Sequence, residues 1–467
     1  MTAEEFAERW LTNLPYVAND QQVQVMAALT RFCARGNSGG DPVFVLCGYA
    51  GTGKTTLCAS LVRTLREAGT ASVLMAPTGR AAKVFSAYCG YPAHTIHRTI
   101  YRPPSDGCPF TEVLVNPRSN TVFIVDEASM IGGETDGAFL LSDLIQFVFS
   151  GSNNRLILMG DTAQLPPVGC SESPALDSAV LRSYGLNVSR AMLTDTVRQA
   201  KSSGILYNAT RLRRAMRLSP LPVPQLCFDG FSDVVPVSGE ELEEVLSDAY
   251  CTDGIDDTVI ITRANWRATQ FNLAVRQRLL GREEELCRDD MLLVAKNNYF
   301  WTARIKDGGF IANGDTARVV RIYGTEERYG FRFADVRLFF PHSGLETDCK
   351  IIMECLLSDS PALSHEQQQR LFQSVYTDPA LFTEYTPHGA RLRAMKTNPH
   401  YQALQVKYAY AVTCHKAQGG QWTNVFVDLG SIAPEALTGI DFYRWLYTAT
   451  TRATTRLFYL NPFCADS

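Results

Sequence analysis

A glycine-rich segment near the N-terminus constrains this chain more than any other part of its sequence. Gly48–Thr55 spells Gly-Tyr-Ala-Gly-Thr-Gly-Lys-Thr and fits the pattern G-x-x-x-x-G-K-S/T. The apolar run Val43–Cys47 before it predicts a buried strand, and Thr56–Ala68 after it predicts a helix that ends at Gly69. A glycine-rich turn between a strand and a helix points backbone N–H groups at an anion. The segment therefore predicts a binding site for a nucleoside triphosphate.

The residues of this segment have distinct expected roles. Lys54 is expected to reach the β- and γ-phosphates of ATP, and the Thr55 hydroxyl is expected to bind Mg²⁺. Other residues of the turn and of the helix start are expected to surround the phosphates: Gly48, Gly51, Thr52, Gly53 and Thr56.

Composition is that of a globular protein, and it excludes some classes. The chain has 467 residues, of which 46% are hydrophobic and 20% are charged. No apolar run approaches the roughly 18–20 residues of a membrane span, and Met1–Trp10 lacks the order of a signal peptide. The 13 cysteines form no C-x-x-C pair, which favours reduced thiols in a cytoplasmic protein over a disulfide framework or a zinc site.

The net charge of −4 argues against nucleic-acid binding but does not exclude it, because cationic groups can gather in one cleft. Two locally basic stretches are Arg211, Arg213, Arg214 and Arg217, and Arg391, Arg393, Lys396 and Lys407. Each stretch fits a solvated helix face as well as a binding surface.

Short apolar runs alternate with helical patterns along most of the chain. The runs are Val43–Cys47, Val73–Ala76, Val122–Val125, Leu156–Met159, Val259–Ile261, Val425–Leu429 and Leu457–Leu460. Their length and composition are typical of strands buried on both faces of a parallel sheet. Because a long gap separates the first four runs from the rest, we expect an α/β fold with two parallel-sheet domains.

Two inserts interrupt the alternation. Residues of about 100–120 are rich in turn formers and predict a hairpin, with a strand at Thr111–Val115. Beyond residue 305 the apolar period changes to two, and a small antiparallel barrel is predicted. Its strands are expected at Thr316–Tyr323, Gly330–Phe340 and Lys350–Leu357, followed by a polar helix at Ser364–Val375.

Polar side chains follow two of the predicted strands. Asp126 and Glu127 come directly after the run Val122–Val125, where Asp126 is expected to hold Mg²⁺ and Glu127 to polarise the attacking water. A bland alternative is that both acids only cap a strand. Gln164, past the run Leu156–Met159, is the candidate that senses the γ-phosphate.

The order of these segments resembles superfamily 1 helicases, in the 5′-to-3′ branch that contains RecD, Dda and the Pif-type helicases. Further segments carry the resemblance: Asn19–Ala28, Ala76–Ala82, Thr95–His97, Leu193–Gln199, Asn313–Asp315, Ala411–Gly419 and Tyr447–Ala453.

The resemblance implies two RecA-like domains, with a hairpin in the first and an SH3-like barrel inserted in the second. The implied boundaries are 1–190 for the first domain, 191–304 with 403–467 for the second, and 305–402 for the barrel insert.

The resemblance also implies residue roles. Gln22 would recognise adenine, and Arg198 and Arg452 would be arginine fingers that neutralise charge on the transferred phosphoryl group. DNA contacts would come from Pro77, Thr78, Gly79, His97, Thr413, His415 and Lys416. Tyr101 and Phe110 are candidates for a strand-separating pin. His97, Tyr101 and Phe110 fit plain packing roles as well.

The function that follows is an ATP-dependent DNA helicase that moves 5′ to 3′ on single-stranded DNA and unwinds tailed duplexes. The chain is expected to act as a monomer, away from membranes, with other repair, recombination or replication proteins as possible partners. Two alternatives stay open: a motor subunit of a recombination or repair complex with little unwinding of its own, and a P-loop enzyme of another class. RNA as the substrate is not excluded.

Overall fold

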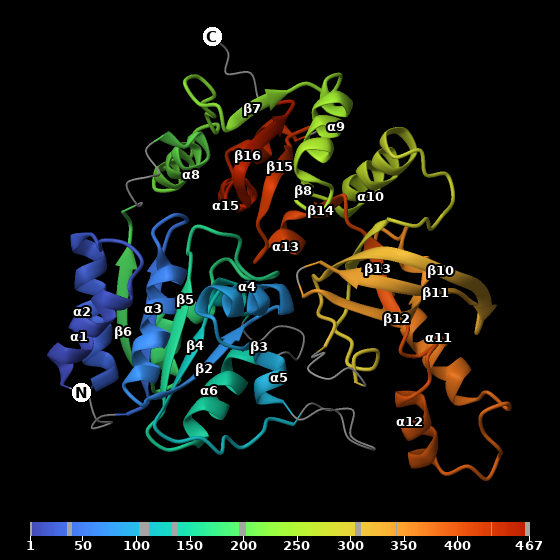
Figure 1. Ribbon diagram of the computed structural model, residues 1–467, viewed down its shortest axis with the longest axis horizontal. Helices are drawn as coiled ribbons and strands as arrows, with labels where there is room; N and C mark the ends of the chain where they lie inside the picture. The colour runs from blue at the N-terminus through green and yellow to red at the C-terminus, as the bar shows by residue number, and fades with distance from the viewer. Residues whose placement is uncertain are drawn as a thin grey trace. The chain divides into compact units, whose positions relative to one another are not determined.

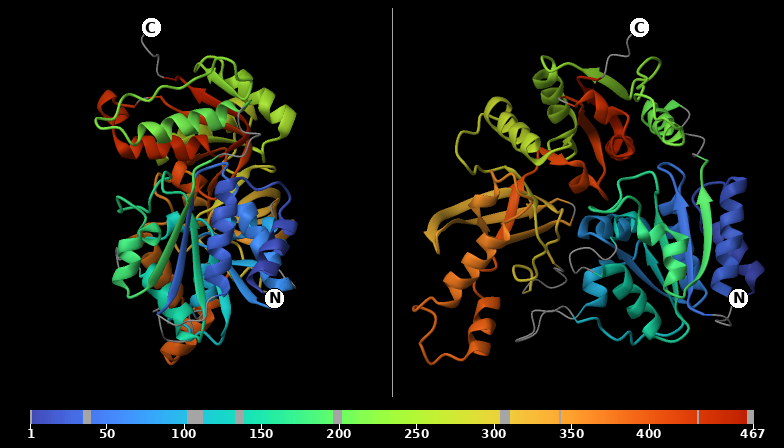
Figure 2. Two further views of the ribbon diagram at one scale, coloured as in Figure 1. Left: turned by 90° about the vertical axis from the view of Figure 1, so that its left-hand side faces the viewer. Right: turned by 180° about the vertical axis from the view of Figure 1, so that it is seen from behind.

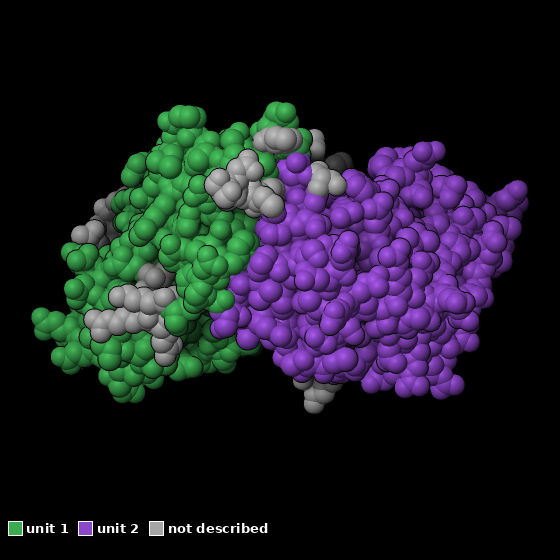
Figure 3. Space-filling view, turned by 90° about the horizontal axis from the view of Figure 1, so that it is seen from above, with its two compact units in different colours: residues 1–103, 111–231, 433–451 green, residues 104–110, 232–432, 452–467 purple. Residues whose placement is uncertain are grey.

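The computed structural model describes residues 2–34, 40–101, 112–132, 139–195, 202–303, 310–341, 343–430 and 432–462. It contains two compact units (Figure 3). Unit 1 comprises residues 1–103, 111–231 and 433–451, and unit 2 comprises residues 104–110, 232–432 and 452–467. None of the described helices combines the length and apolarity that a transmembrane span requires.

Unit 1 is built on a six-stranded sheet with the order β3-β2-β4-β5-β1-β6 (Figure 1). The strands are β1 (Pro42–Gly48), β2 (Ala71–Ala76), β3 (Ala93–Thr95), β4 (Thr121–Val125), β5 (Arg155–Gly160) and β6 (Asn187–Leu193). All five pairings are parallel, so the chain must cross over between neighbours.

Helices make these crossovers and cover both faces of the sheet (Figure 2). The helices of the sheet region are α1 (Ala3–Asn13), α2 (Asp20–Ala34), α3 (Lys54–Glu67), α4 (Gly79–Cys89), α5 (Ile96–Ile100), α6 (Leu140–Ser150) and α7 (Ser178–Ser183). Unit 1 also includes α8 (Gly204–Ala215), α14 (Pro434–Leu437) and α15 (Ile440–Thr450), which follow the last strand of the sheet in the chain. Short 3₁₀ turns η1 (Ala128–Met130) and η2 (Pro174–Leu176) follow β4 and precede α7.

Strand β1 shows why its sequence is apolar throughout. Phe44 and Leu46 pack into the core that α1 to α4 cover, whereas Val43 and Val45 pack into the core on the other face with α5 and α6. Successive side chains of a strand point to opposite faces, so a strand covered on both sides has no polar position. The apolar runs of the sequence thus fall within strands, and the expected fold class is confirmed.

Unit 2 contains a second parallel sheet with the order β14-β8-β15-β16-β7. The strands are β7 (Val234–Val237), β8 (Thr258–Thr262), β14 (Ala411–Thr413), β15 (Trp422–Asp428) and β16 (Ala453–Leu460). The helices that accompany this sheet are α9 (Leu242–Asp253), α10 (Asn265–Ala274), its continuation η4 (Val275–Leu279) and α13 (Cys414–Ala417).

A closed barrel with the order β10-β11-β12-β13-β9 completes unit 2. Its strands are β9 (Met291–Val294), β10 (Thr316–Arg328), β11 (Phe331–Phe340), β12 (Leu345–Ile352) and β13 (Leu404–Tyr408). The turn η5 (Met353–Cys355) and the helices α11 (His365–Tyr376) and α12 (His388–Lys396) lie between β12 and β13. Two barrel strands, β9 and β13, therefore come from outside residues 305–402.

The strand expected at Lys350–Leu357 is wrong in its bounds, because β12 begins at Leu345 and ends at Ile352. Glu346 and Asp348 made the earlier residues look unlike a strand. In the barrel both acids lie within 4 Å of Arg337 on β11, at 3.7 and 2.8 Å, and cross-strand ion pairs of this kind make acidic positions acceptable in a strand.

Residues 102–111 of the expected hairpin, with Phe110 and Thr111, lie outside the described residues. The strand expected at Thr111–Val115 is wrong over its described part, because residues 112–115 form only an isolated antiparallel bridge, between Tyr101 and Val113.

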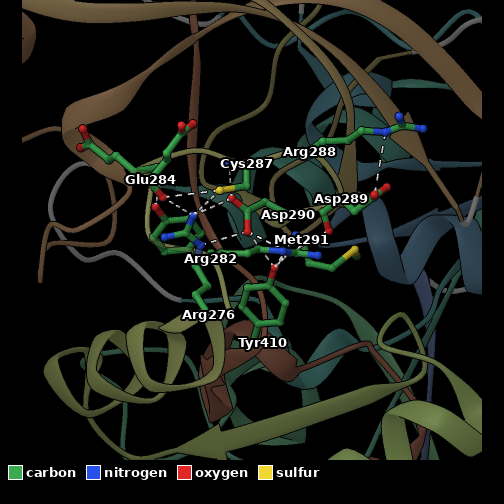
Figure 4. Close-up of polar contacts among 11 residues, drawn as sticks. Arg276, Arg282, Glu284, Cys287, Arg288, Asp289, Asp290, Met291 and Tyr410 are labelled. Atoms are coloured by element: carbon green, nitrogen blue, oxygen red, sulfur yellow. Dashed lines mark hydrogen bonds and ion pairs between the residues drawn. The ribbon is translucent and has the colours of Figure 1, made fainter. Parts of the chain in front are cut away.

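A buried ion cluster joins the sheet and the barrel of unit 2 (Figure 4). Asp290, which is fully buried, precedes β9 and accepts hydrogen bonds from Arg276 of η4 at 2.9 Å through both carboxylate oxygens. It also accepts from Arg282 at 2.9 Å and from the Tyr410 hydroxyl at 2.9 Å. The Tyr410 hydroxyl in turn accepts from the backbone N–H of Met291 at 3.1 Å. One carboxylate thus links a helix of the sheet, a strand of the barrel and the segment between β13 and β14.

We expect Asp290→Ala to lower the free energy of unfolding by about 3–5 kcal/mol, because it leaves the buried Arg276 without a counter-charge. The control is Glu243→Ala, since Glu243 pairs with Arg278 at 3.3 Å where both side chains are mostly exposed. That control should change the free energy by about 0–1 kcal/mol. Urea unfolding followed by circular dichroism measures both, and equal losses would contradict the assignment.

Candidate nucleotide-binding site

Three parallel strands of unit 1 bring the expected nucleotide-site residues to one edge of the sheet. β5 lies between β1 and β4, and the register pairs Cys47 with Gly160 and Val125 with Leu158. Because the carboxyl ends of parallel strands meet at the same edge, the segments that follow these strands are neighbours. They carry Lys54 after β1, Asp126 and Glu127 after β4, and Gln164 after β5.

The turn between β1 and α3 requires glycine. Gly51 and Gly53 have φ of 75° and 83°, a region that residues with a side chain rarely adopt. A Cβ at Gly53 would also lie 2.7 Å from the Tyr16 hydroxyl. Gly53 is the N-cap of α3 and supplies no side chain to cap it, so the first helical N–H groups are available to an anion.

Side chains of the turn bond to the turn itself. Lys54 Nζ donates to the carbonyl oxygens of Gly48 at 2.6 Å and Tyr49 at 3.0 Å, and the buried Thr52 hydroxyl donates to Tyr49 at 2.7 Å. Thr55 and Thr56 lie in the first turn of α3. The Lys54 ammonium group therefore lies against the loop that is expected to surround the phosphates of a nucleotide.

Gln22 lies beside the same loop. It is 1% exposed in the first turns of α2, and its Nε2 donates to the Thr52 carbonyl at 3.0 Å and to the Tyr16 hydroxyl at 3.2 Å. Its Oε1 accepts from the backbone N–H of Asn19 at 3.1 Å. The structure thus joins Gln22 to the phosphate loop; its role toward adenine stays a prediction.

Asp126 and Glu127 end β4 in an unusual backbone conformation. Glu127 has φ of 52°, and its N–H donates to Asp126 Oδ1 at 2.9 Å. Burial, and then the nearby charge of Glu127, raise the pKa of Asp126 to about 7, while a hydrogen bond from the Thr55 hydroxyl acts in the opposite direction. A divalent cation would favour the ionised carboxylate.

The residues present fit Mg²⁺. The Thr55 hydroxyl lies near enough to Asp126 to lower the pKa of its carboxyl, and both groups offer the hard oxygen ligands that Mg²⁺ takes together with phosphate oxygens. No cluster of three or more His, Cys, Asp or Glu ligands occurs in the described ranges.

Gln164 lies in the loop after β5 and is 7% exposed. Its Oε1 and the Ser129 hydroxyl are buried without a hydrogen-bond partner among the residues that the structure describes. Both residues line a pocket with an empty volume of about 830 Å³, together with Asp161, Arg190 and Arg444. A buried oxygen without a hydrogen-bond partner beside a polar pocket is typical of a group that accepts its hydrogen bond from a ligand or a water.

Tyr447 of α15 contacts this site, and the sequence reasoning had not singled it out. Its hydroxyl accepts from the backbone N–H of Ala50 in the phosphate loop at 3.0 Å and donates to Asp161 Oδ2 at 2.6 Å. Beside it, the Thr448 hydroxyl accepts from the Leu165 N–H at 2.9 Å. The only signal in the sequence was the position of Tyr447 at the start of the segment Tyr447–Ala453.

The basic stretch at the end of α8 also reaches the loop. The Arg213 guanidinium stacks on the Tyr49 ring at 3.8 Å, and Arg217 donates to the Tyr49 hydroxyl at 3.1 Å. Because Arg213 and Arg217 both contact Tyr49, they are not simply part of a solvated helix face. In the second basic stretch, Arg391 donates to the carbonyls of Tyr376 and Thr383, which fixes the loop between α11 and α12.

The residues expected to contact DNA lie in two places. In unit 1, Pro77 and Thr78 lie between β2 and α4, where the Thr78 hydroxyl accepts from the Ala81 N–H and caps α4, and Gly79 begins that helix. His97 lies in α5 with its ring 5.6 Å from that of Tyr101, and burial lowers its pKa.

In unit 2, Thr413 ends β14, and His415 and Lys416 lie in α13. Burial lowers the pKa of both His415 and Lys416, and Lys416 Nζ donates to Asn313 Oδ1 at 3.0 Å. Arg452 is 4% exposed and donates to the Gly420 carbonyl at 3.3 Å.

The remaining expected residues differ in status. Tyr101 donates to Asp143 Oδ2 of α6 at 2.6 Å, an arrangement that suits the packing alternative. Phe110 and Arg198 lie outside the described residues, so their roles stay predictions.

Two protein-family models match the chain. The model described as an AAA domain matches residues 18–217, and the UvrD-like helicase C-terminal domain matches residues 408–459. The first range contains the phosphate loop and both carboxylates, and the second contains Thr413 and Arg452.

Two curated proteins are similar. The ATP-dependent RecD2 DNA helicase of Deinococcus radiodurans is 37% identical over 129 residues, which are 28% of this chain and 17% of that protein. An uncharacterized protein of Methanocaldococcus jannaschii is 22% identical over 455 residues, 89% of this chain and 36% of that protein. The chain thus spans less than two thirds of the length of the curated relatives it matches.

A solved structure is similar over nearly the whole chain. The crystal structure of Pif1 helicase from Bacteroides in complex with ADP-AlF3 and ssDNA has a TM-score of 0.50 and 16% identity over 96% of this chain and 94% of that chain. This likeness concerns the fold. The chain is thus similar to AAA domains over residues 18–217 and to UvrD-like helicase C-terminal domains over residues 408–459.

We expect Tyr447→Phe to tighten nucleotide binding by up to about tenfold, because the lost hydroxyl competes with a phosphate oxygen for the Ala50 N–H, and one hydrogen bond is worth about 1 kcal/mol. Titration with a fluorescent ATP analogue measures the dissociation constant. The control is Tyr443→Phe, which removes a hydroxyl of the same helix that donates to Pro222 at 2.8 Å. Weaker or unchanged binding by Tyr447→Phe would contradict this competition.

Proposed function

We propose that this protein is an ATP-driven DNA helicase that translocates 5′ to 3′ on single-stranded DNA. The observation that carries the proposal is the convergence of Lys54, Asp126, Glu127 and Gln164 at one edge of the first parallel sheet. Tyr447, the first residue of the segment Tyr447–Ala453, contacts Ala50 and Asp161 at the same edge. In such an arrangement, a change in the phosphates alters the contacts of α15, the helix that carries Tyr447.

The proposed hydrolysis assigns one task to each group. Lys54 and the loop amides hold the β- and γ-phosphates. Thr55 and Asp126 would hold Mg²⁺, which would neutralise charge on these phosphates. Glu127 accepts the proton of the attacking water, and Gln164 orients that water or the γ-phosphate. Gln22 selects adenine, and Arg198 and Arg452 stabilise the charge that develops in the transition state.

The proposed DNA contacts are mostly to phosphates. Thr78 and His97 of unit 1 and Thr413, His415 and Lys416 of unit 2 lie at loops and short helices that follow strands. Contacts of this kind make binding depend on salt and little on base sequence. The D. radiodurans relative named as a DNA helicase and the Bacteroides structure with ssDNA support this choice of substrate.

Other parts of the expected organisation are also proposals. They are domain boundaries at 190, 304 and 402, action as a monomer in the cytoplasm, and cooperation with repair, recombination or replication proteins. The cysteines of the described segments are all free, which supports a reducing compartment.

Unwinding assays on 5′-tailed, 3′-tailed and blunt duplexes test the proposed polarity. We expect ATP-dependent strand separation of the 5′-tailed duplex only, because the motor must load on single-stranded DNA before it moves. Unwinding only from a 3′ tail would overturn the polarity. DNA-stimulated ATP hydrolysis without strand separation would favour a motor subunit of a larger complex.

We expect Glu127→Gln to bind ATP and DNA normally and to lower the turnover rate by about 10²–10⁴-fold, because an amide cannot accept the proton of the attacking water. Steady-state ATP hydrolysis with saturating DNA measures the rate. Glu366→Gln removes an exposed carboxylate of α11 and should leave the rate unchanged. A near-normal rate for Glu127→Gln would remove Glu127 from this role.

A further inference from the structure

Unit 2 carries a pair of stacked aromatic rings, one exposed and the other partly buried. The rings of Tyr299 and Phe310 lie 5.1 Å apart with an interplanar angle of 18°. They flank the antiparallel bridge of Asn298 and Ile311, whose backbone hydrogen bonds are 2.7 and 2.9 Å long. Ile311 is fully buried and Asn298 is 9% exposed, whereas Tyr299 is 50% exposed. The bridge thus anchors the segment and leaves the Tyr299 ring at the surface.

Two further contacts hold this segment rigid. Asn298 Nδ2 and Trp301 Nε1 both donate to the carbonyl of Gln402, at 2.9 and 2.8 Å. Gln402 lies two residues before the barrel strand β13. A fixed aromatic ring loses little conformational freedom when a ligand stacks on it, and this favours binding.

Hydrogen bonds connect the segment to a residue already expected to bind DNA phosphates. Asn297 Oδ1 accepts from the Asn313 N–H at 2.7 Å, and Asn313 Oδ1 accepts from Lys416 Nζ at 3.0 Å. Tyr299 is two residues beyond Asn297, about 7 Å along an extended chain. The aromatic pair is therefore tied to Lys416 through two asparagine side chains.

A second cation lies on the same segment. Lys296 is exposed and, with Asn297, lines a groove of about 650 Å³ that also includes Tyr401 and Gln402. Cations that hold phosphates beside aromatic rings that stack on bases are the combination by which proteins bind single-stranded nucleic acid. A duplex does not fit this surface, because its base faces are covered by their neighbours.

We propose that Tyr299 and Phe310 form a base-stacking platform for single-stranded DNA, with Lys296 and Lys416 as the neighbouring phosphate contacts. The platform rests on the proposed function and deepens it. The DNA contacts expected from the sequence are to phosphates, whereas this platform would contact bases. It is separate from the pin candidates Tyr101 and Phe110.

The test uses the full chain and two fluorescent oligonucleotides of equal length, oligothymidylate and the same phosphodiester backbone without bases. We expect Tyr299→Ala to weaken binding of oligothymidylate by roughly 5- to 100-fold, the range for one stacked base, and to leave the abasic strand unaffected. Phe310→Ala should act in the same direction, and Tyr299→Trp should restore binding. Tyr385→Ala, which removes a tyrosine that is 92% exposed, is the control and should bind both strands normally.

Salt titration separates stacking from charge. Tyr299→Ala should keep the dependence of log Kd on log salt, whereas Lys416→Ala should reduce its slope by about 1. Unchanged oligothymidylate binding by Tyr299→Ala, or an equal loss for the abasic strand, would overturn the platform alone. Failure of the unmodified protein to bind either strand would overturn the proposed function and the platform with it.

Discussion

Parallel pairing of β4, β5 and β1 is the constraint on which the rest of the site depends. Each strand is buried on both faces and is apolar along most of its length, so the polar groups of the site follow the strand ends, and parallel strands place those ends on the same edge. Lys54, Asp126 and Gln164 come from distant parts of the sequence and meet there for that reason. The pairing is itself held by the two apolar cores that alternate residues of β1, such as Phe44 and Val45, form on opposite faces.

Polar groups at this edge have protein partners that a nucleotide could replace. Lys54 bonds to carbonyls of its own loop, and the Ala50 N–H bonds to Tyr447. Buried donors left without a partner are costly, so such substitutes are expected where a ligand site is built from backbone amides. Gln164 Oε1 has no such substitute among the described residues. Phosphate binding would therefore exchange contacts at Lys54 and Ala50 and add one at Gln164, and the exchange at Ala50 frees Tyr447 of α15.

Much of the fold could be predicted from the sequence, because strands of a doubly covered sheet are apolar throughout and stand out as runs. The β12 prediction failed for the opposite reason: Glu346 and Asp348 are polar residues within a strand, where they are partly exposed and pair with Arg337 of β11, and the local sequence does not reveal that pairing. In the candidate site, the residues within motifs were found, whereas Arg213 and Arg217 were visible only as a basic stretch. Their contact with Tyr49 depends on how α8 packs.

By itself, the sequence determined the phosphate loop, the two carboxylates after an apolar run, and the order of motifs that resembles superfamily 1 helicases. These are local features, since a glycine-rich turn or a strand end needs only its neighbours in the chain. The tertiary structure decided which side chains contact the loop, namely Tyr447, Gln22 and the arginines of α8. It also decided that Tyr299 is exposed while Asn298 and Ile311 beside it are buried. Such contacts join residues that are far apart in sequence, and only the packing of helices against the sheet and of the barrel against its loops brings them together.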